Sequence, residues 1–419
     1  MKLTQYKLGQ LLNITRGASL SGEYYATEGE HIRLTLGHFD YVNGGFKENT
    51  SKDNLYFTGD VKEEFILKKG DIITPLTEQT FGLIGSTAII PESGKYIQSQ
   101  DIGLVKCNEE LLYSGFCYYL LPTQLVKAQL SAGAQQTSIR HTSPDKIKYC
   151  TVFIPSLSEQ KRIANLLSYV DKKISINRQI NRDLEALAKQ IYDYWFVQFD
   201  FPDENGRPYK SSGGMMVWND DLKREIPEGW NNGIFADIAN ITMGQSPDGS
   251  SYNEEGIGSI FYQGSTDFGV RFPSVRMFTT SPSRFAKQGD ILMSVRAPVG
   301  AVNIANSDCC IGRGLSAINS KIGSITYIYY VVHYLKVRFD SLNTAGTTFG
   351  SITKDELFKL PVVVPSDNVI ERFESICKPI FGKQMEIGFE MEQLTKQRNE
   401  LLPLLMNGQV TINPDLSND

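Results

Sequence analysis

The chain has 419 residues, of which 21% are charged and 41% are hydrophobic, a composition typical of a globular protein with room for two or three domains. It has no apolar segment at the N-terminus and no run of about 20 apolar residues, so we expect a cytoplasmic protein without membrane spans. The six cysteines show no C-x-x-C spacing and the four histidines lie far from them, which disfavours both a metal centre and a disulfide framework.

The net charge of −5 disfavours nucleic-acid binding if it is taken alone, because phosphate contacts need clustered lysine and arginine side chains. Segment 271–313 departs from this average, with six basic residues against two acidic ones and a local charge of +4. The basic residues are Arg271, Arg276, Arg284, Lys287, Arg296 and Arg313. On charge alone this segment fits a phosphate-binding patch and an ordinary solvated surface equally well.

Residues 1–155 contain short β-type runs, such as 71–74 and 87–90, separated by Gly, Asn and Ser. A helix is predicted near Leu112–Leu130. The loop that follows, residues 131–141, combines glycine with glutamine and arginine, whose donors and acceptors match base edges. The segment therefore predicts a small α+β domain whose polar loop suits either base contacts or an ordinary surface.

A long helix is predicted after this domain, because neither Gly nor Pro occurs between Pro155 and Pro202. Its apolar residues follow alternating steps of three and four, as in the seam of a coiled coil, and Ser158 is the expected N-cap. The seam residues are Ile163, Leu167, Val170, Ile174, Leu184, Ala188, Ile191 and Trp195, with Asn177 and Asn181 at two further positions. Seam asparagines are expected to specify register at some cost in stability.

The rest of the chain repeats this plan. Residues 230–365 again contain β-type runs, at 290–295 and 360–364, a helix near Thr326–Asp340 and a polar loop at 344–354. A second 3-4 rhythm follows, in which Pro379 and Gly382 should kink or restart the helix. Its positions are Ile370, Phe373, Cys377, Ile380, Gln384, Ile387, Met391, Leu394, Arg398, Leu401 and Leu405.

Matched strings show that the chain is an internal duplication. Asn13–Gly17 recurs as Asn240–Gly244, Lys69–Ile72 recurs as Gln288–Ile291, and the pair Ala132-Gly133 recurs as Ala345-Gly346. The difference in residue number between matched positions decreases from one string to the next. Along the helix seams this difference stays constant: it is the same for the first pair, Ile163 and Phe373, as for the last, Trp195 and Leu405. Insertions and deletions have thus accumulated in the globular parts while helix length stayed fixed. Each helix of about 40 residues would be about 60 Å long, which spans under two turns of duplex DNA.

Catalytic motifs are weak or absent. No adenine-methylase N-P-P-[YF] loop occurs, and the nearest string, 413–416, lacks the aromatic residue. Pro144-Asp145 followed by Glu159-Gln160-Lys161 matches a loose nuclease pattern, but there the E-x-K should lie on a strand, whereas here it opens the long helix.

Several strings resemble the specificity subunits of type I restriction-modification systems, over essentially the whole chain. Residues 154–164 resemble the family's junction between the first recognition domain and the first conserved helix, and 194–202, 205–209 and 226–230 resemble its connector. The second junction, 365–373, departs from the family's Glu-Gln pattern. The resemblance implies a non-catalytic DNA reader without a cofactor or metal of its own. The implied partners are double-stranded DNA, two modification subunits with S-adenosylmethionine, and restriction subunits that use ATP and Mg²⁺.

We therefore expect an α+β fold in which two similar α/β target recognition domains are separated by two long antiparallel helices, with pseudo-two-fold repetition. The expected boundaries are domain 1 at 1–155, helix 1 at 156–200, a connector at 201–229, domain 2 at 230–365, helix 2 at 366–407 and a tail at 408–419. Each domain should read one half of a split site. The alternatives are a subunit of a related bifunctional restriction-methylation system, an enzyme with its own site, and a structural or glycan-binding scaffold.

Two sets of candidate residues follow. Those expected at the DNA surface are Arg16, Arg33, Thr77, Gln79, Gln135, Gln136, Arg140, His141, Arg271, Arg276, Arg284, Arg296, Arg313, Thr347, Thr348 and Lys354. Those expected to pair the helices are Ile163, Leu167, Val170, Ile174, Asn177, Asn181, Leu184, Ile191, Ile380, Ile387, Met391, Leu394 and Leu401.

Overall fold

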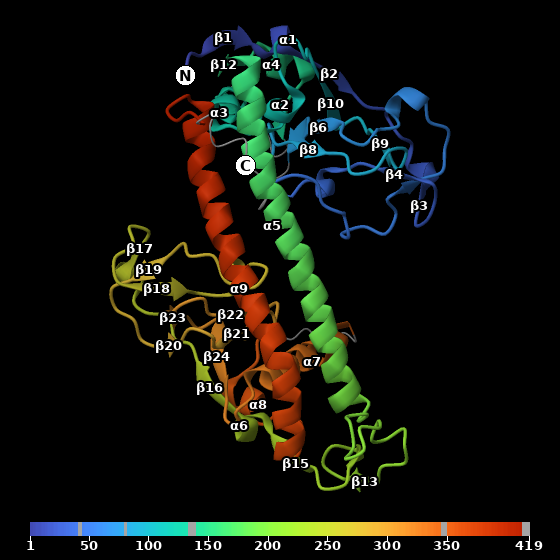
Figure 1. The fold of residues 1–419 in the computed structure, drawn as a ribbon, viewed down its shortest axis with the longest axis vertical. Coiled ribbons are helices and arrows are strands. Elements are labelled where there is room, and N and C mark those ends of the chain that lie inside the picture. Colours follow the sequence, from blue (N-terminus) through green and yellow to red (C-terminus); the bar gives the residue numbers. More distant parts are fainter. Residues whose placement is uncertain (41–43, 79–81, 133–139, 345–349, 413–419) are drawn as a thin grey trace. The chain divides into compact units, whose positions relative to one another are not determined.

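The computed structural model describes residues 1–40, 44–78, 82–132, 140–344 and 350–412, and the side chains of all of these except Arg140 and 337–344. The chain divides into two compact units: Met1–Lys173 with Leu394–Asp419, and Ile174–Gln393. Each unit holds one globular domain together with part of both long helices (Figure 1).

The first domain runs from β1 to β12 and is built on two small sheets. One is antiparallel, with strand order β2 (Leu12–Arg16), β10 (Ile102–Cys107), β6 (Ile72–Pro75), β8 (Ala88–Ile89). The other has the order β3 (Tyr25–Ala26), β5 (Tyr56–Phe57), β4 (His31–Arg33), β9 (Tyr96–Ile97), with β4 and β9 parallel. Two further pairs are β1 (Thr4–Lys7) with β12 (Thr151–Ile154), and β7 (Thr77–Glu78) with β11 (Arg140–His141). Its helices are α1 (Leu8–Leu11), α2 (Ser114–Leu120), α3 (Gln124–Ala132) and α4 (Pro144–Tyr149).

The second domain runs from β15 to β25 and repeats this topology. Its antiparallel sheet has the order β16 (Ala239–Met243), β24 (Leu315–Ser320), β21 (Ile291–Ser294), β22 (Val302–Ile304). Its mixed sheet has the order β17 (Tyr252–Asn253), β19 (Phe278–Thr279), β18 (Ser259–Tyr262), β23 (Cys309–Ile311), β20 (Phe285–Ala286), with β18 and β23 parallel. β15 (Asn231–Ile234) pairs with β25 (Pro361–Val364), and the helices are α6 (Phe235–Ile238), α7 (Ile325–Thr344) and α8 (Lys354–Phe358). The connector before it forms a hairpin of β13 (Met216–Asn219) and β14 (Arg224–Pro227).

The strand positions confirm the duplication. β16 starts at Ala239 and β2 at Leu12, which is the same shift that relates Asn240 to Asn13 in the matched strings. β21 starts at Ile291 and β6 at Ile72, the last residues of the second matched pair of strings. Because strand order and pairing agree as well, each strand of the antiparallel sheet in one domain identifies its counterpart in the other.

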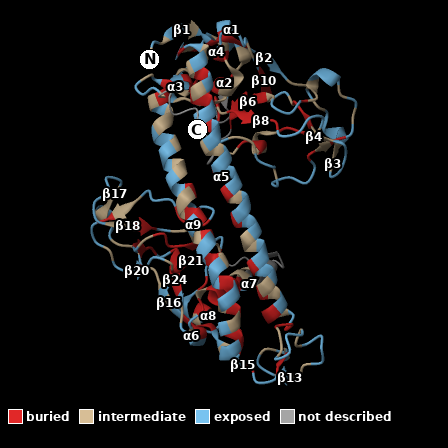
Figure 2. Ribbon diagram, viewed as in Figure 1, coloured by how far each residue is buried: buried red, intermediate tan, exposed pale blue. Residues whose placement is uncertain are grey.

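The two long helices are α5 (Leu157–Tyr192), which continues as a π-helical turn at Asp193–Val197, and α9 (Asp367–Met406). In the first unit, Ile163 and Leu167 near the start of α5 share a hydrophobic core with Leu405 and Met406 at the end of α9. In the second unit, the end of α5 shares a core with the start of α9 through Tyr192 and Phe373, among others. The helices therefore pack together in antiparallel fashion, and all residues predicted to pair them are buried or half-buried (Figure 2).

Three local expectations were wrong. α9 does not restart at Pro379 and Gly382, because the packed side chains around them hold the helix together despite one missing hydrogen bond. The helix predicted near 112–130 is divided into α2 and α3, with Pro122 between them. Ser158 is not an N-cap, since α5 already begins at Leu157. No helix among the described residues is long and apolar enough to cross a membrane.

Candidate nucleic-acid interface

In both domains, the described residues at the C-terminal end of the polar loop pair with the chain just after an inner strand of the antiparallel sheet, β6 or β21. In the second domain Ile352 N donates to Val295 O at 2.9 Å, and Arg296 forms a β-bridge with Ser351. In the first domain Thr142 N donates to Leu76 O at 2.8 Å, and β11 pairs His141 with Thr77. The two arrangements are equivalent, so in each domain the described residues at the C-terminal end of the predicted loop lie beside the residues that follow β6 or β21.

A concave surface in the second domain gathers three of the predicted arginines. We call it the arginine surface; it is lined by Arg276, Arg296 and Arg313 together with Gln263, Gly264, Ser265, Thr266, Asp267, Ser294, Ala297 and Gly314. All three arginines are exposed. Among the described residues, neither the Arg296 nor the Arg313 guanidinium has an ionic or hydrogen-bonding partner, so the surface keeps positive charge available for an anionic ligand.

The backbone beneath these arginines is tightly held. A Cβ at Gly314 would lie 2.6 Å from Gln263 O, so this close approach requires a glycine. Arg313 N donates to Ser246 Oγ at 3.2 Å, and the Ser294 hydroxyl donates to Arg296 O at 2.7 Å. Arginines on such fixed supports present their charge without first ordering a loop.

Arg276 is additionally oriented through its side chain. Its Nε donates to Asp267 Oδ1 at 2.8 Å, and its Nη2 donates to the same oxygen. The Asp267 side chain is 10% exposed whereas that of Arg276 is 60% exposed. A largely buried carboxylate therefore aims an exposed guanidinium.

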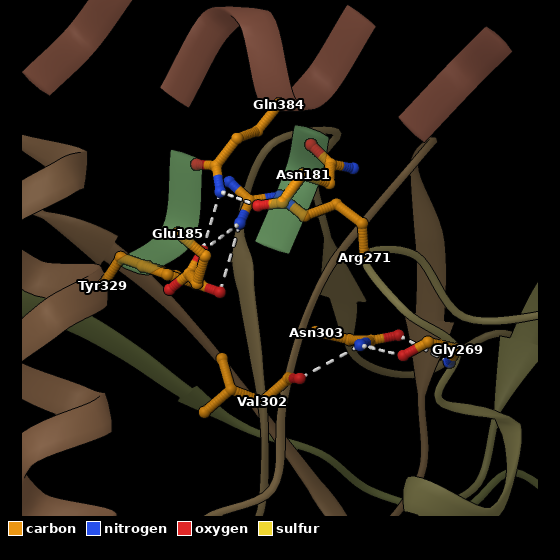
Figure 3. A network of polar contacts seen from close by, with 8 residues as sticks. All are labelled: Asn181, Glu185, Gly269, Arg271, Val302, Asn303, Tyr329 and Gln384. Atoms are coloured by element: carbon orange, nitrogen blue, oxygen red, sulfur yellow. Dashed lines mark hydrogen bonds and ion pairs between the residues drawn. The ribbon is translucent and has the colours of Figure 1, made fainter. Parts of the chain in front are cut away.

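Arg271, predicted to belong to the same basic patch, lies elsewhere. Its side chain is 5% exposed, and its Nη1 donates to Glu185 Oε2 on α5 at 3.2 Å and to the Tyr329 hydroxyl at 3.1 Å (Figure 3). Gln384 on α9 donates to the same Glu185 oxygen at 2.8 Å. The guanidinium also lies 4.5 Å from the centre of the Phe381 ring. Arg271 thus joins the second domain to both helices within its unit and is not available at the arginine surface.

Arg33 is likewise engaged inside its domain. It is buried, its Nη2 donates to Asn54 O at 3.0 Å, and its guanidinium stacks 3.7 Å from the centre of the Tyr25 ring. It supports the mixed sheet of the first domain and does not reach the surface.

The other candidates are distributed as follows. Arg16 at the end of β2, His141 in β11, Arg284 before β20 and Lys354 at the start of α8 are exposed, and Thr77 in β7 is buried. Arg140 pairs through its backbone with Glu78. Gln79, Gln135, Gln136, Thr347 and Thr348 lie outside the described residues.

Two acidic residues with structural importance at these surfaces were missed from the sequence. The buried Glu78 carboxylate accepts hydrogen bonds from the backbone N–H groups of Gly82, Leu83 and Ile84 at 2.8–3.0 Å, which fixes the backbone of 82–84 beside β7. Asp267 orients Arg276, as described above. Neither Glu78 nor Asp267 was predicted, because the candidates were basic and amide side chains. The structural role of both carboxylates depends on which backbone and guanidinium groups the fold places beside them.

The geometry disfavours the nuclease alternative. Glu159 and Lys161 lie in the first turns of α5 and Asp145 lies on α4, so the E-x-K string is helical. Within the described part of the chain, no group of three or more His, Cys, Asp or Glu side chains could hold a metal ion. The string 413–416 lies outside the described residues.

Comparison with known proteins places these features in a family. The family model described as the type I restriction modification DNA specificity domain matches residues 2–186 and 227–402. Each matched segment contains one globular domain and most of the long helix that follows it.

Individual relatives match over most of the chain. A specificity subunit assigned to the MjaX type I restriction enzyme of Methanocaldococcus jannaschii is 31% identical and covers 85% of this chain and 83% of its own. The HindI specificity subunit of Haemophilus influenzae is 22% identical over 82% of this chain and 87% of its own. The crystal structure of a type I restriction-modification S subunit from M. genitalium aligns over 97% of this chain and 96% of its own, with a TM-score of 0.60 at 17% identity, which is a likeness of fold.

Proposed function

Because the chain belongs to the type I restriction-modification specificity-subunit family, we propose that each of its two globular domains reads one half of a split, asymmetric DNA site. As a member of this family, the chain is the non-catalytic subunit that recognises DNA for a larger restriction and modification enzyme, and it binds no cofactor itself.

The observation that carries the proposal is the equivalence of the two loop-and-strand surfaces, which present different side chains. Arg296 bridges Ser351 in the second domain, and Thr77 pairs with His141 at the matching place in the first. Equivalent backbone support with unlike side chains is what two readers of unlike half-sites require.

For the two long helices we propose two tasks: to set the gap between the half-sites and to dock two modification subunits. The repeated seam supports this, because equal helices in a pseudo-two-fold arrangement offer equivalent surfaces to two identical partners. Exposed apolar residues on α5 add to that support: Leu166, Tyr169, Ile176, Ile180 and Leu187. S-adenosylmethionine would then be bound by the modification subunits, and ATP and Mg²⁺ by restriction subunits. The complex would work in the cytoplasm, where it meets DNA.

Exchange of domains tests the division into half-sites. Residues 230–365 are replaced by the corresponding segment of another family member, and the methylated motif of the assembled enzyme is mapped. One half of the motif should change and the other should persist. A change in both halves, or in neither, would overturn the proposal.

Shortening of the helices tests the ruler. Removal of about seven residues, or two helical turns, from both α5 and α9 at matched seam positions should shorten each by about 10 Å, or about three base pairs. The gap in the methylated motif should shorten accordingly. An unaltered gap in an active enzyme would contradict the role of the helices as a spacer.

A further inference from the structure

We propose that the half-site read by the second domain contains a G·C pair, and that Arg276, held by Asp267, reads its guanine. The inference rests on the proposed function, since it specifies the chemistry by which one domain reads its half. It is based on the arginine surface and on the residue at the equivalent position of the first domain.

The Arg276 side chain is prepared to make a directed contact. A guanidinium has five N–H donors, of which two face the Asp267 carboxylate here, so the outer edge formed by Nη1 and Nη2 remains available. Asp267 is itself fixed, as it ends the 3₁₀ turn Ser265–Asp267 and its backbone oxygen accepts from Ser274 N at 2.7 Å. Binding therefore loses little side-chain entropy at Arg276.

The chemistry of that edge selects guanine among the four bases. Guanine presents two acceptors, O6 and N7, to the major groove, and these match two parallel guanidinium donors. Adenine presents one acceptor and one donor, so an arginine in the same pose would face an N–H group. A fixed arginine thus discriminates between bases, whereas a freely moving one serves equally well as a counter-charge for phosphate.

Arg296 and Arg313 are suited to the second role, that of a counter-charge for phosphate. They line the same surface, and among the described residues their guanidinium groups have no partner, so they lack the side-chain support that Asp267 gives to Arg276. We assign them to phosphate oxygens on either side of the base contact. Arg276 would then contact the base, while Arg296 and Arg313 bind the phosphates beside it.

The first domain has a different residue at the position equivalent to Asp267. At the end of its equivalent 3₁₀ turn, Leu36–His38, the carboxylate is replaced by His38, and Lys47 N donates to His38 O just as Ser274 N donates to Asp267 O. Thr35 N donates to His38 Nδ1 at 3.0 Å, and burial lowers the pKa of His38 to about 4, so the ring is neutral at physiological pH. Because Nδ1 already accepts from Thr35 N, the neutral ring offers an arginine neither a second acceptor nor a negative charge, which makes the guanine contact a property of the second domain.

The test maps the motif first. The methylated motif is mapped for the wild-type enzyme assembled with its modification subunits, and domain exchange then assigns one half of this motif to the second domain. That half should contain at least one G·C pair. If it contains only A·T pairs, the guanine assignment is overturned while the division into half-sites stands. If exchange does not confine the change to one half, the proposed function itself is refuted.

Variants then identify the residue. Arg276→Ala should lower discrimination at a single G·C position by roughly 5- to 150-fold, in methylation of duplexes that carry one substituted pair each, with the other positions unchanged. Asp267→Asn, which keeps the side-chain volume, should weaken discrimination at the same position. Lys359→Ala removes an exposed cation of the same domain that does not line the arginine surface, and it should leave the motif unchanged.

Two outcomes would overturn the assignment. If Arg276→Ala weakens binding to all duplexes equally and reduces the salt dependence of binding by about one counterion, Arg276 contacts phosphate. If Asp267→Asn alters a position other than the one altered by Arg276→Ala, the carboxylate does not act through Arg276. Binding of the full chain to duplexes, measured alongside its far-ultraviolet circular dichroism, separates either result from misfolding.

Discussion

Removal of the Glu185 carboxylate should destabilise the second unit far more than removal of an ordinary surface glutamate. Glu185 Oε2 accepts from Arg271 at 3.2 Å and from Gln384 at 2.8 Å. The Arg271 side chain is 5% exposed, so in Glu185→Ala a buried cation would lose its counter-charge. Breaking a fully buried pair costs about 3–5 kcal/mol. Because Glu185 is itself 31% exposed and water can enter, we expect about 2–3 kcal/mol.

The assay is urea unfolding of the full chain followed by tryptophan fluorescence. All three tryptophans, Trp195, Trp218 and Trp230, belong to the second unit, so the signal reports on that unit. The matched control is Glu386→Ala on α9. Glu386 pairs with Lys383 at 2.9 Å, but both side chains are well exposed, and we expect a loss below about 0.5 kcal/mol.

A double variant separates loss of a charge partner from loss of packing. Glu185→Leu with Arg271→Met removes both charges, and it should cost less than Glu185→Ala alone because no uncompensated charge remains. The reasoning is refuted if Glu185→Ala costs no more than Glu386→Ala, or if the double variant is the least stable of the set.

Other predictions concern helix packing, buried asparagine and pH. Gly382→Ala should stabilise α9 by about 1 kcal/mol in thermal unfolding, because the added Cβ would meet no atom of the described residues within 4 Å. In Gly388→Ala the Cβ would lie 2.7 Å from Phe272 Cε2, so the same gain should be cancelled or reversed. Asn181→Leu should raise the free energy of unfolding in urea by about 1 kcal/mol, since both polar atoms of the buried Asn181 side chain have no hydrogen-bonding partner in the described part of the chain; a loss of stability would show that the asparagine is satisfied. Because burial lowers the pKa of His38 from 6.5 to about 4, the unfolded chain binds the proton first, and stability should fall by up to about 3 kcal/mol as the pH drops from 6.5 to 4; His38→Asn should remove this part of the pH dependence.

The sequence alone determined the repeat, the two long helices and their seam. These follow from periodicity, because a 3-4 spacing of apolar residues places them on one helix face whatever the surroundings. The recurrence of Asn13–Gly17 as Asn240–Gly244 likewise predicted that β2 and β16 occupy the same place in their two domains. The expectation that the helix would restart at Pro379 and Gly382 was wrong because local propensity was outweighed by packing along the whole of α9.

Only the tertiary structure decided which arginines face outward. Arg271 and Arg276 belong to the same basic segment, yet one is buried between helix residues and the other is aimed outward by Asp267. Local charge and residue spacing do not distinguish these two arginines, because the difference lies in which carboxylate each guanidinium contacts after folding. Glu185 is distant from Arg271 in the sequence, and such a pairing depends on the packing of a whole domain against a helix, which no local pattern encodes.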